Sequence, residues 1–121
     1  MALKNTLRGS LLVATLAATA PALAFNWLFM QDTPYSHFTE EDHKIFDEAM
    51  NDILEKGADG ETRTWSNPNS TAGGELKVVK SFERDGVPCR TLSIANQAKG
   101  RSASGEYRFC KQAADKWAPG K

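Results

Sequence analysis

The sequence has few cysteines, no excess of charge of one sign and no long hydrophobic run. Its 121 residues include two cysteines, and 15 basic residues balance 15 acidic ones. Without a basic patch or stripe, the chain lacks the electrostatic signature of nucleic-acid-binding proteins. The apolar run at Leu11–Ala20 is shorter than the roughly 18 residues that a membrane-spanning helix needs. The sequence therefore argues against nucleic acid as a partner and against a membrane-spanning helix.

The motifs of the common catalytic and cofactor-binding classes are also missing. Cys89 and Cys110 form neither the Cys-x-x-Cys motif of a dithiol enzyme nor a haem attachment site, and two cysteines are too few for zinc. No nucleophile motif surrounds a serine. His37, His43 and Asp47 could supply two or three metal ligands, but residues scattered on a polar face are more often solvated. We expect no enzymatic activity, no cofactor and no metal.

The first 24 residues have the organisation of a secretory signal peptide. Lys4 and Arg8 precede the apolar run, and the Ala22–Ala24 tripeptide has small residues at the spacing that signal peptidase reads. Removing these 24 of the 121 residues leaves 97, with 13 basic and 15 acidic residues. A chain of this length forms one small domain, for which a covalent cross-link would add useful stability.

The spacing of the two cysteines predicts a disulfide between neighbouring strands. Export leads to an oxidising compartment, where two cysteines are expected to pair. If Val87–Ala95 and Ala103–Lys111 are the arms of a hairpin that turns at Lys99–Gly100, Cys89 and Cys110 lie directly opposite each other. The sequence therefore predicts a Cys89–Cys110 disulfide.

A second hairpin signal, Asp85–Gly86, lies between strand-like segments at 75–84 and 87–95. A regular ladder places Phe82 opposite Cys89 and Val79 opposite Leu92. Because side chains alternate along a strand, two faces are predicted. One face carries Val79, Leu92, Ile94, Tyr107 and Phe109, and the other carries Leu76, Val78, Phe82, Cys89 and Cys110.

Residues 38–57 have the three- and four-residue apolar spacing of an amphipathic helix that would cover one of these faces. Thr39 is expected to be its N-cap and Gly57 its C′ residue. The apolar residues are Ile45, Phe46, Ala49, Met50, Ile53 and Leu54. With a strand at 61–66, a loop at 67–74 and a short segment around Trp117, we predict an α+β fold: one helix on an antiparallel sheet of about four strands.

The segment 25–38, ahead of the helix, is rich in aromatic residues, including Trp27 and Phe38. One interpretation is a strap that packs over the core, with Phe38 stapled to the helix. The other is an exposed apolar arm that contacts a partner or a membrane surface. The predicted organisation is a signal peptide at 1–24, an aromatic strap at 25–38 and a single α+β domain at 39–121.

A series of tryptophan, glycine and cysteine residues runs through the second half of the chain. It comprises Trp65-Ser66-Asn67-Pro68, Gly74, Asp85-Gly86, Cys89-Arg90, Gly105, Cys110-Lys111 and Trp117. Over about residues 60–117 this series resembles the C-terminal domain of the bacterial seventeen-kilodalton surface-antigen family. The resemblance implies a small β-rich outer-membrane or periplasmic protein, and it carries over no catalytic residue. Unlike many members, the chain has no cysteine at the cleavage site and no glycine zipper.

Five side chains are candidates for contact with a ligand or partner: Trp27, Trp65, Asn67, Arg90 and Arg108. An aromatic ring such as that of Trp65 can stack on a sugar, although closing one end of a small sheet is the commoner role. Arg90 and Arg108 could bind an anionic group, and packing of Arg90 over Phe109 is the alternative.

Together these features predict a secreted, non-enzymatic structural or interaction protein of the cell envelope, periplasmic or associated with the outer membrane. Its expected partner is an envelope protein or a cell-wall component, and peripheral membrane association stays open. One alternative is a small periplasmic binding or inhibitor module for a hydrolase or a cell-wall glycan, with the loop at 67–74 as its contact. Another is a metal- or redox-active accessory protein.

Overall fold

The computed structural model describes residue 30 and residues 33–114 and 116–120. The predicted signal peptide and Trp27 lie outside these residues. The elements, in chain order, are the 3-10 helix η2 (Pro34–His37), the helix α1 (Glu40–Lys56) and the strands β1 (Thr62–Ser66), β2 (Gly73–Arg84), β3 (Val87–Ala98), β4 (Arg101–Ala113) and β5 (Lys116–Pro119).

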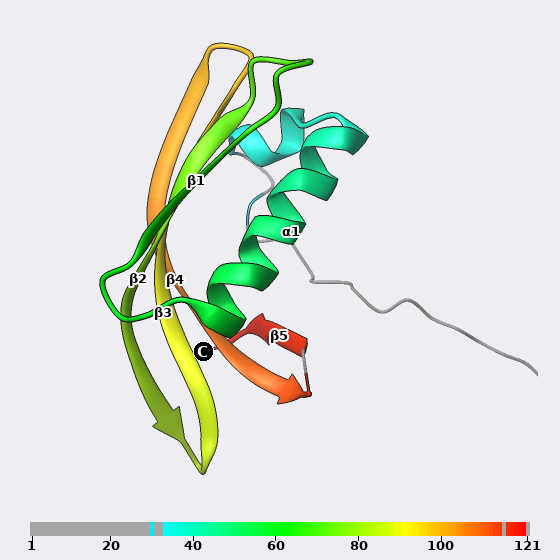
Figure 1. Ribbon diagram of the computed structural model, residues 1–121. Coiled ribbons are helices and arrows are strands. Elements are labelled where there is room, and N and C mark those ends of the chain that lie inside the picture. Colours follow the sequence, from blue (N-terminus) through cyan, green and yellow to red (C-terminus); the bar gives the residue numbers. More distant parts are fainter. Residues whose placement is uncertain (1–29, 31–32, 115, 121) are drawn as a thin grey trace, which may run out of the picture.

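The five strands form one antiparallel meander in the order β1-β2-β3-β4-β5. The sheet is strongly curved, and α1 lies on its concave side (Figure 1). The predicted α+β architecture is therefore confirmed. The sheet has five strands rather than about four, because the segment around Trp117 pairs with the end of β4 as β5.

Helix α1 begins and ends where the sequence predicts. Thr39 is the N-cap of a capping box, and the expected apolar residues face the sheet, with Ile45 and Ala49 only half-buried. Gly57 ends the helix as its C-cap in an extended conformation (φ −69°), one position earlier than the predicted C′ residue. Glycine is needed for space, because a Cβ atom there would lie 2.6 Å from the Ile53 carbonyl oxygen.

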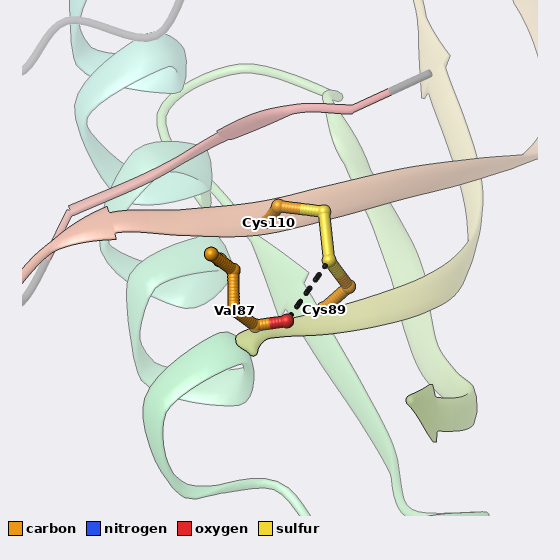
Figure 2. Close-up of a disulfide and its surroundings, with 3 residues drawn as sticks. All are labelled: Val87, Cys89 and Cys110. Carbon is orange, nitrogen blue, oxygen red and sulfur yellow. Dashed lines mark hydrogen bonds between the residues drawn. A yellow bond between two sulfur atoms is a disulfide. The ribbon is translucent and has the colours of Figure 1, made fainter. Parts of the chain in front are cut away.

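The β3–β4 hairpin confirms the predicted cysteine pairing. Cys89 and Cys110 are directly opposite, with their Cα atoms 4.0 Å apart, and form a disulfide that joins the two strands (Figure 2). The dashed line in Figure 2 joins Cys89 Sγ to the Val87 carbonyl oxygen, and the two atoms are 3.5 Å apart. Because a disulfide sulfur carries no hydrogen, this is a sulfur–oxygen contact. The disulfide thus fixes the register of the central hairpin.

The β2–β3 hairpin departs from the regular ladder at one residue. Phe82 lies opposite Cys89 as predicted, but a bulge between Val78 and Lys80 places Val78 opposite Leu92. The predicted Val79–Leu92 pair is wrong, and Val79 is 38% exposed. A one-residue slip exchanges the two faces of a strand.

The bulge therefore corrects the predicted division of the faces. Leu76 and Val78 lie in the core with Leu92, on the α1 side, instead of sharing a face with the cysteines. The bulge reconciles two requirements that differ by one residue: the Asp85–Gly86 turn sets one alternation, and burial of Leu76 and Val78 under α1 sets the other.

The core lies between α1 and the concave face of the sheet. Its buried residues are Met30, Phe38, Phe46, Met50, Ile53, Leu54, Trp65, Ala72, Leu76, Val78, Leu92, Ile94, Ala98, Phe109 and Trp117. Met30 and Phe38 belong to the predicted strap, so its described part packs over the domain. Phe38 also contacts His43 at a ring-centroid distance of 5.4 Å, which is the expected staple to α1.

Candidate functional site

The first turn of α1 is tied to the loop after β1 through the carboxylate of Asp42. This side chain is only 1% exposed. Its Oδ1 accepts hydrogen bonds of 2.7 Å from both Asn67 and Ser70, and its Oδ2 accepts one of 2.8 Å from the Thr39 N–H. Burial alone would raise the pKa of Asp42, but these hydrogen bonds together outweigh it, and the pKa is lowered. The buried carboxylate is thus kept ionised.

Asn67, a predicted contact residue, has a structural role within this loop. Its side chain is buried, and its Oδ1 accepts a 2.9 Å hydrogen bond from the Asn69 N–H. Its main-chain N–H donates to the Ala72 carbonyl. Held in this way, the loop exposes Pro68, Asn69 and Thr71 to solvent.

Trp65, another predicted contact residue, lies in the core with 5% exposure. Its ring contacts Phe38 and Phe46, and its Nε1 donates a 3.0 Å hydrogen bond to Asn96 across the intervening strand β2. Gly74 makes room for this bond, because a Cβ atom there would lie 2.3 Å from Asn96 Oδ1 and 2.8 Å from Trp65 Nε1. Trp65 therefore has a structural role in the core.

A shallow groove of about 800 Å³ lies beside this loop. Its lining is rich in hydroxyl, amide and small side chains, among them Ser66, Thr71, Gln97, Ser102 and Ser104. Its polar groups could contact a hydroxyl-rich ligand, although the ring of Trp65 is buried at its margin.

Arg90 holds the other end of α1. It lies opposite Phe109 in the sheet, on the same side as the helix. Its Nη1 donates hydrogen bonds to the main-chain carbonyl oxygens of Ile53 (3.0 Å) and Gly57 (2.5 Å). The Ile53 carbonyl already accepts the Gly57 N–H (2.9 Å), so Arg90 is its second donor, and the Gly57 carbonyl belongs to the C-cap that ends α1. A positive charge here also complements the helix dipole.

Next to Arg90, β5 is attached to the helix through Glu55. The indole Nε1 of Trp117 donates a 2.5 Å hydrogen bond to the Glu55 carboxylate, and Lys111 Nζ lies 3.4 Å from the same oxygen. The hydrogen bond from Trp117 is the main reason that the pKa of Glu55 is lowered, and Lys111 and Arg90 add to it against the effect of burial. These contacts explain how the short strand β5 is held beneath α1 (Figure 1).

The predicted contact residues are not gathered into one site. Trp65 and Asn67 lie near the start of α1, Arg90 lies at its end, and Arg108 is exposed on the opposite face of the sheet, where it pairs with Thr91. Trp27 lies outside the described residues. Four further residues that hold the domain together, Asp42, Ser70, Asn96 and Glu55, were not predicted from the sequence. Among them, only Asp42 could have been recognised from the sequence, because it is the third residue after the Thr39 N-cap, where a side chain can complete a capping box.

The histidine pattern has a packing role in α1. His43 makes edge contacts with the rings of Tyr35 and Phe38, and burial lowers its pKa against the opposing effect of Asp42 and Glu40. Within residues 33–114 and 116–120, no three His, Cys, Asp or Glu side chains converge on a position for a metal ion. No helix in the described part of the chain has the length and apolarity needed to cross a membrane.

The chain was compared with protein-family models, with curated proteins and with solved structures, and none of them matches it.

Proposed function

We propose that the protein is an exported, non-enzymatic interaction protein of the cell envelope, periplasmic or associated with the outer membrane. The Cys89–Cys110 disulfide is the observation that carries the proposal. Disulfides of this structural kind persist in oxidising compartments and are rare in the cytosol. The N-terminal segment, with its basic residues, apolar run and Ala22–Ala24 tripeptide, supplies the matching export signal.

The polar clusters of the domain have structural roles at the two ends of α1. Asp42 and Asn67 hold the start of α1, while Arg90 and Glu55 hold its end. Each of these groups has a structural partner, so the function is assigned to exposed surface. The resemblance of residues 60–117 to the seventeen-kilodalton surface antigens is consistent with this proposal.

The intact mass of the protein recovered from the cell envelope tests export and the disulfide together. We expect the mass of a chain that begins at Phe25. Before reduction and alkylation, this mass should be two hydrogen atoms lower than that of the same chain with free thiols. A retained N-terminal segment or free thiols would contradict the proposal. If the expected mass is found, cross-linking in intact cells would identify the envelope protein or cell-wall component that the protein contacts.

A second candidate is a small binding or inhibitor module for a periplasmic hydrolase or a cell-wall glycan. The observation that favours it is the loop after β1, which exposes Pro68, Asn69 and Thr71 on a frame held by the buried Asn67. A loop ordered in advance loses less entropy on binding, which suits an inhibitor.

This second candidate is best tested without shortening the loop, because Asn67 and Ser70 hold α1. The variant with Asn69→Ala and Thr71→Ala changes exposed side chains only, and Ala58→Ser serves as a matched control on another exposed loop. If the protein inhibits a cell-wall hydrolase such as lysozyme, the loop variant should lose inhibition and the control should retain it. Equal inhibition by all three proteins would exclude this loop as the contact.

A further inference from the structure

The outer side of strand β4 carries an open row of main-chain hydrogen-bonding groups. Strand β5 pairs only with the end of β4, from Phe109 to Ala113. From Arg101 to Arg108, β4 pairs with β3 on one side, and no strand among the described residues pairs with its other side. We call residues Arg101–Arg108 the β4 edge.

The turn before β4 determines which main-chain groups point outward. Lys99–Gly100 has positive φ angles of 53° and 77°, the geometry of a type I′ turn, which makes Ala98 and Arg101 a hydrogen-bonded pair. Because such pairs alternate along an antiparallel ladder, odd-numbered residues of β4 bond to β3 and even-numbered residues face outward. Arg108 follows this rule, since its carbonyl accepts a 2.8 Å hydrogen bond from the Gly120 N–H. The remaining outward residues are Ser102, Ser104 and Glu106.

The β4 edge lacks four of the features with which proteins keep an open strand from pairing, namely proline, lysine, bulges and short length, while its charged side chains are Arg101, Glu106 and Arg108. It contains no proline and no lysine, and its register with β3 is unbroken. It is longer than the typical strand of about five to six residues. Its central residues are small: Ser102, Ala103, Ser104 and Gly105.

The opposite edge of the sheet is formed by the short strand β1 and, beyond it, by the end of β2. Pairing with β1 ends at Lys77, and beyond it β2 has the bulge at Val79 and then Lys80. The Ser81 hydroxyl also donates a 2.6 Å hydrogen bond to Asp59, so the loop between α1 and β1 lies against this edge. The β2 edge thus combines a bulge, a lysine and a covering loop, whereas the β4 edge has charged side chains towards its ends and a contact with η2 near its start.

We propose that the β4 edge pairs with the β4 edge of a second copy of the chain, giving a two-fold dimer with one continuous sheet. Antiparallel pairing about Ala103 or Ser104 brings only small side chains together at the centre, so the strands can approach to ladder spacing. With the axis at Ala103, Gly100 of one copy lies opposite Glu106 of the other, so the turn that carries Lys99 lies next to this carboxylate.

This arrangement is symmetric, so the same contacts satisfy the open groups of both copies. The axis at Ala103 also keeps the partner strand within residues 100–106, short of Arg108, whose carbonyl already bonds to Gly120. The proposal does not depend on export and can be tested separately from it.

Sedimentation velocity of the purified, oxidised protein over a wide concentration range tests the dimer. We expect a reversible monomer–dimer equilibrium. Ser104→Pro removes an N–H group that points outward and none that bonds to β3, and Ser104→Lys adds a charge at the two-fold axis. Losing about two hydrogen bonds per dimer should raise the dissociation constant about tenfold or more.

Ala58→Lys makes the same charge change at an exposed loop position away from β4 and should leave the dimer intact. Near-UV circular dichroism of the buried tryptophans checks that each variant is folded, and Ser104→Lys decides the question if Ser104→Pro unfolds. In the dimer the amide of Ser104 should also exchange more slowly than in the dilute monomer. A wild-type protein that stays monomeric, or a dimer that a folded Ser104 variant leaves unchanged, overturns the proposal.

Discussion

Asn67 donates a 2.7 Å hydrogen bond to the buried carboxylate of Asp42 and so joins the loop after β1 to the first turn of α1. The two residues are 25 positions apart in the chain. A buried charge is costly unless it is hydrogen-bonded, so the carboxylate depends on the donors around it. The position of α1 on the sheet therefore depends on a polar contact as well as on the core.

The variant Asn67→Ala should lower the free energy of unfolding by about 1–3 kcal/mol, because it leaves the buried Asp42 with one donor fewer. Asn69→Ala is the matched control, because the Asn69 side chain donates to Glu41 at the exposed end of the same cluster and does not contact Asp42. Its effect should stay within about 0.5 kcal/mol. Urea unfolding measures both, and equal losses would contradict the role assigned to Asn67.

The stabilising effect of Asp42 should depend on pH. Its pKa is lower in the folded protein than in the unfolded chain, so the ionised group contributes stability above its ordinary pKa. This contribution is lost as the pH falls through the folded pKa. Asp42→Asn should therefore be less stable than wild type at neutral pH, and the difference should shrink below about pH 4. A difference that is constant from pH 7 to pH 2 would refute this linkage.

Glu55 provides an independent comparison at the other end of α1, because its pKa is also lowered. Glu55→Gln should show a pH dependence of the same sign. The two sites share no partner, so their effects on unfolding should add in the double variant.

Replacing Arg90 should loosen the end of α1. Arg90→Met removes the donor to the Ile53 and Gly57 carbonyls and should cost about 2 kcal/mol of unfolding free energy. Arg108→Met is the control, an exposed arginine in the same sheet, and its effect should be within about 0.5 kcal/mol. Hydrogen exchange of the last turn of α1 should accelerate in the first variant only.

The disulfide should stabilise the β3–β4 hairpin as a single unit. Cys89→Ser and Cys110→Ser should each lower the free energy of unfolding by about 3 kcal/mol, and the double variant should lose no more than either single one. Reduction of the wild-type protein should give the same loss in urea unfolding. A double variant much less stable than the single ones would mean that the cysteines act separately.

Much of this fold could be predicted from short-range patterns. The three- and four-residue spacing and the Thr39 cap predicted α1, and the turn residues Asp85–Gly86 predicted one hairpin. The spacing of Cys89 and Cys110 about Lys99–Gly100 predicted the other hairpin and their pairing. These features are local, because each depends on backbone preferences and alternation within one helix or one hairpin.

The candidate contact residues were predicted less well, because their surroundings come from distant parts of the chain. An arginine two residues after Pro88 does not reveal that it will reach the Ile53 and Gly57 carbonyls. In the same way, the Asn-Pro turn after Trp65 shows no sign that Asn67 will meet Asp42.

The sequence by itself determined the helix, its N-cap, the two turns and the pairing of Cys89 with Cys110, because the interactions that define them lie within a helix or between adjacent strands. The tertiary structure alone decided the bulge at Val79. Turn geometry and burial under α1 require alternations that differ by one residue, and only packing of the helix on the sheet brings the two requirements into conflict.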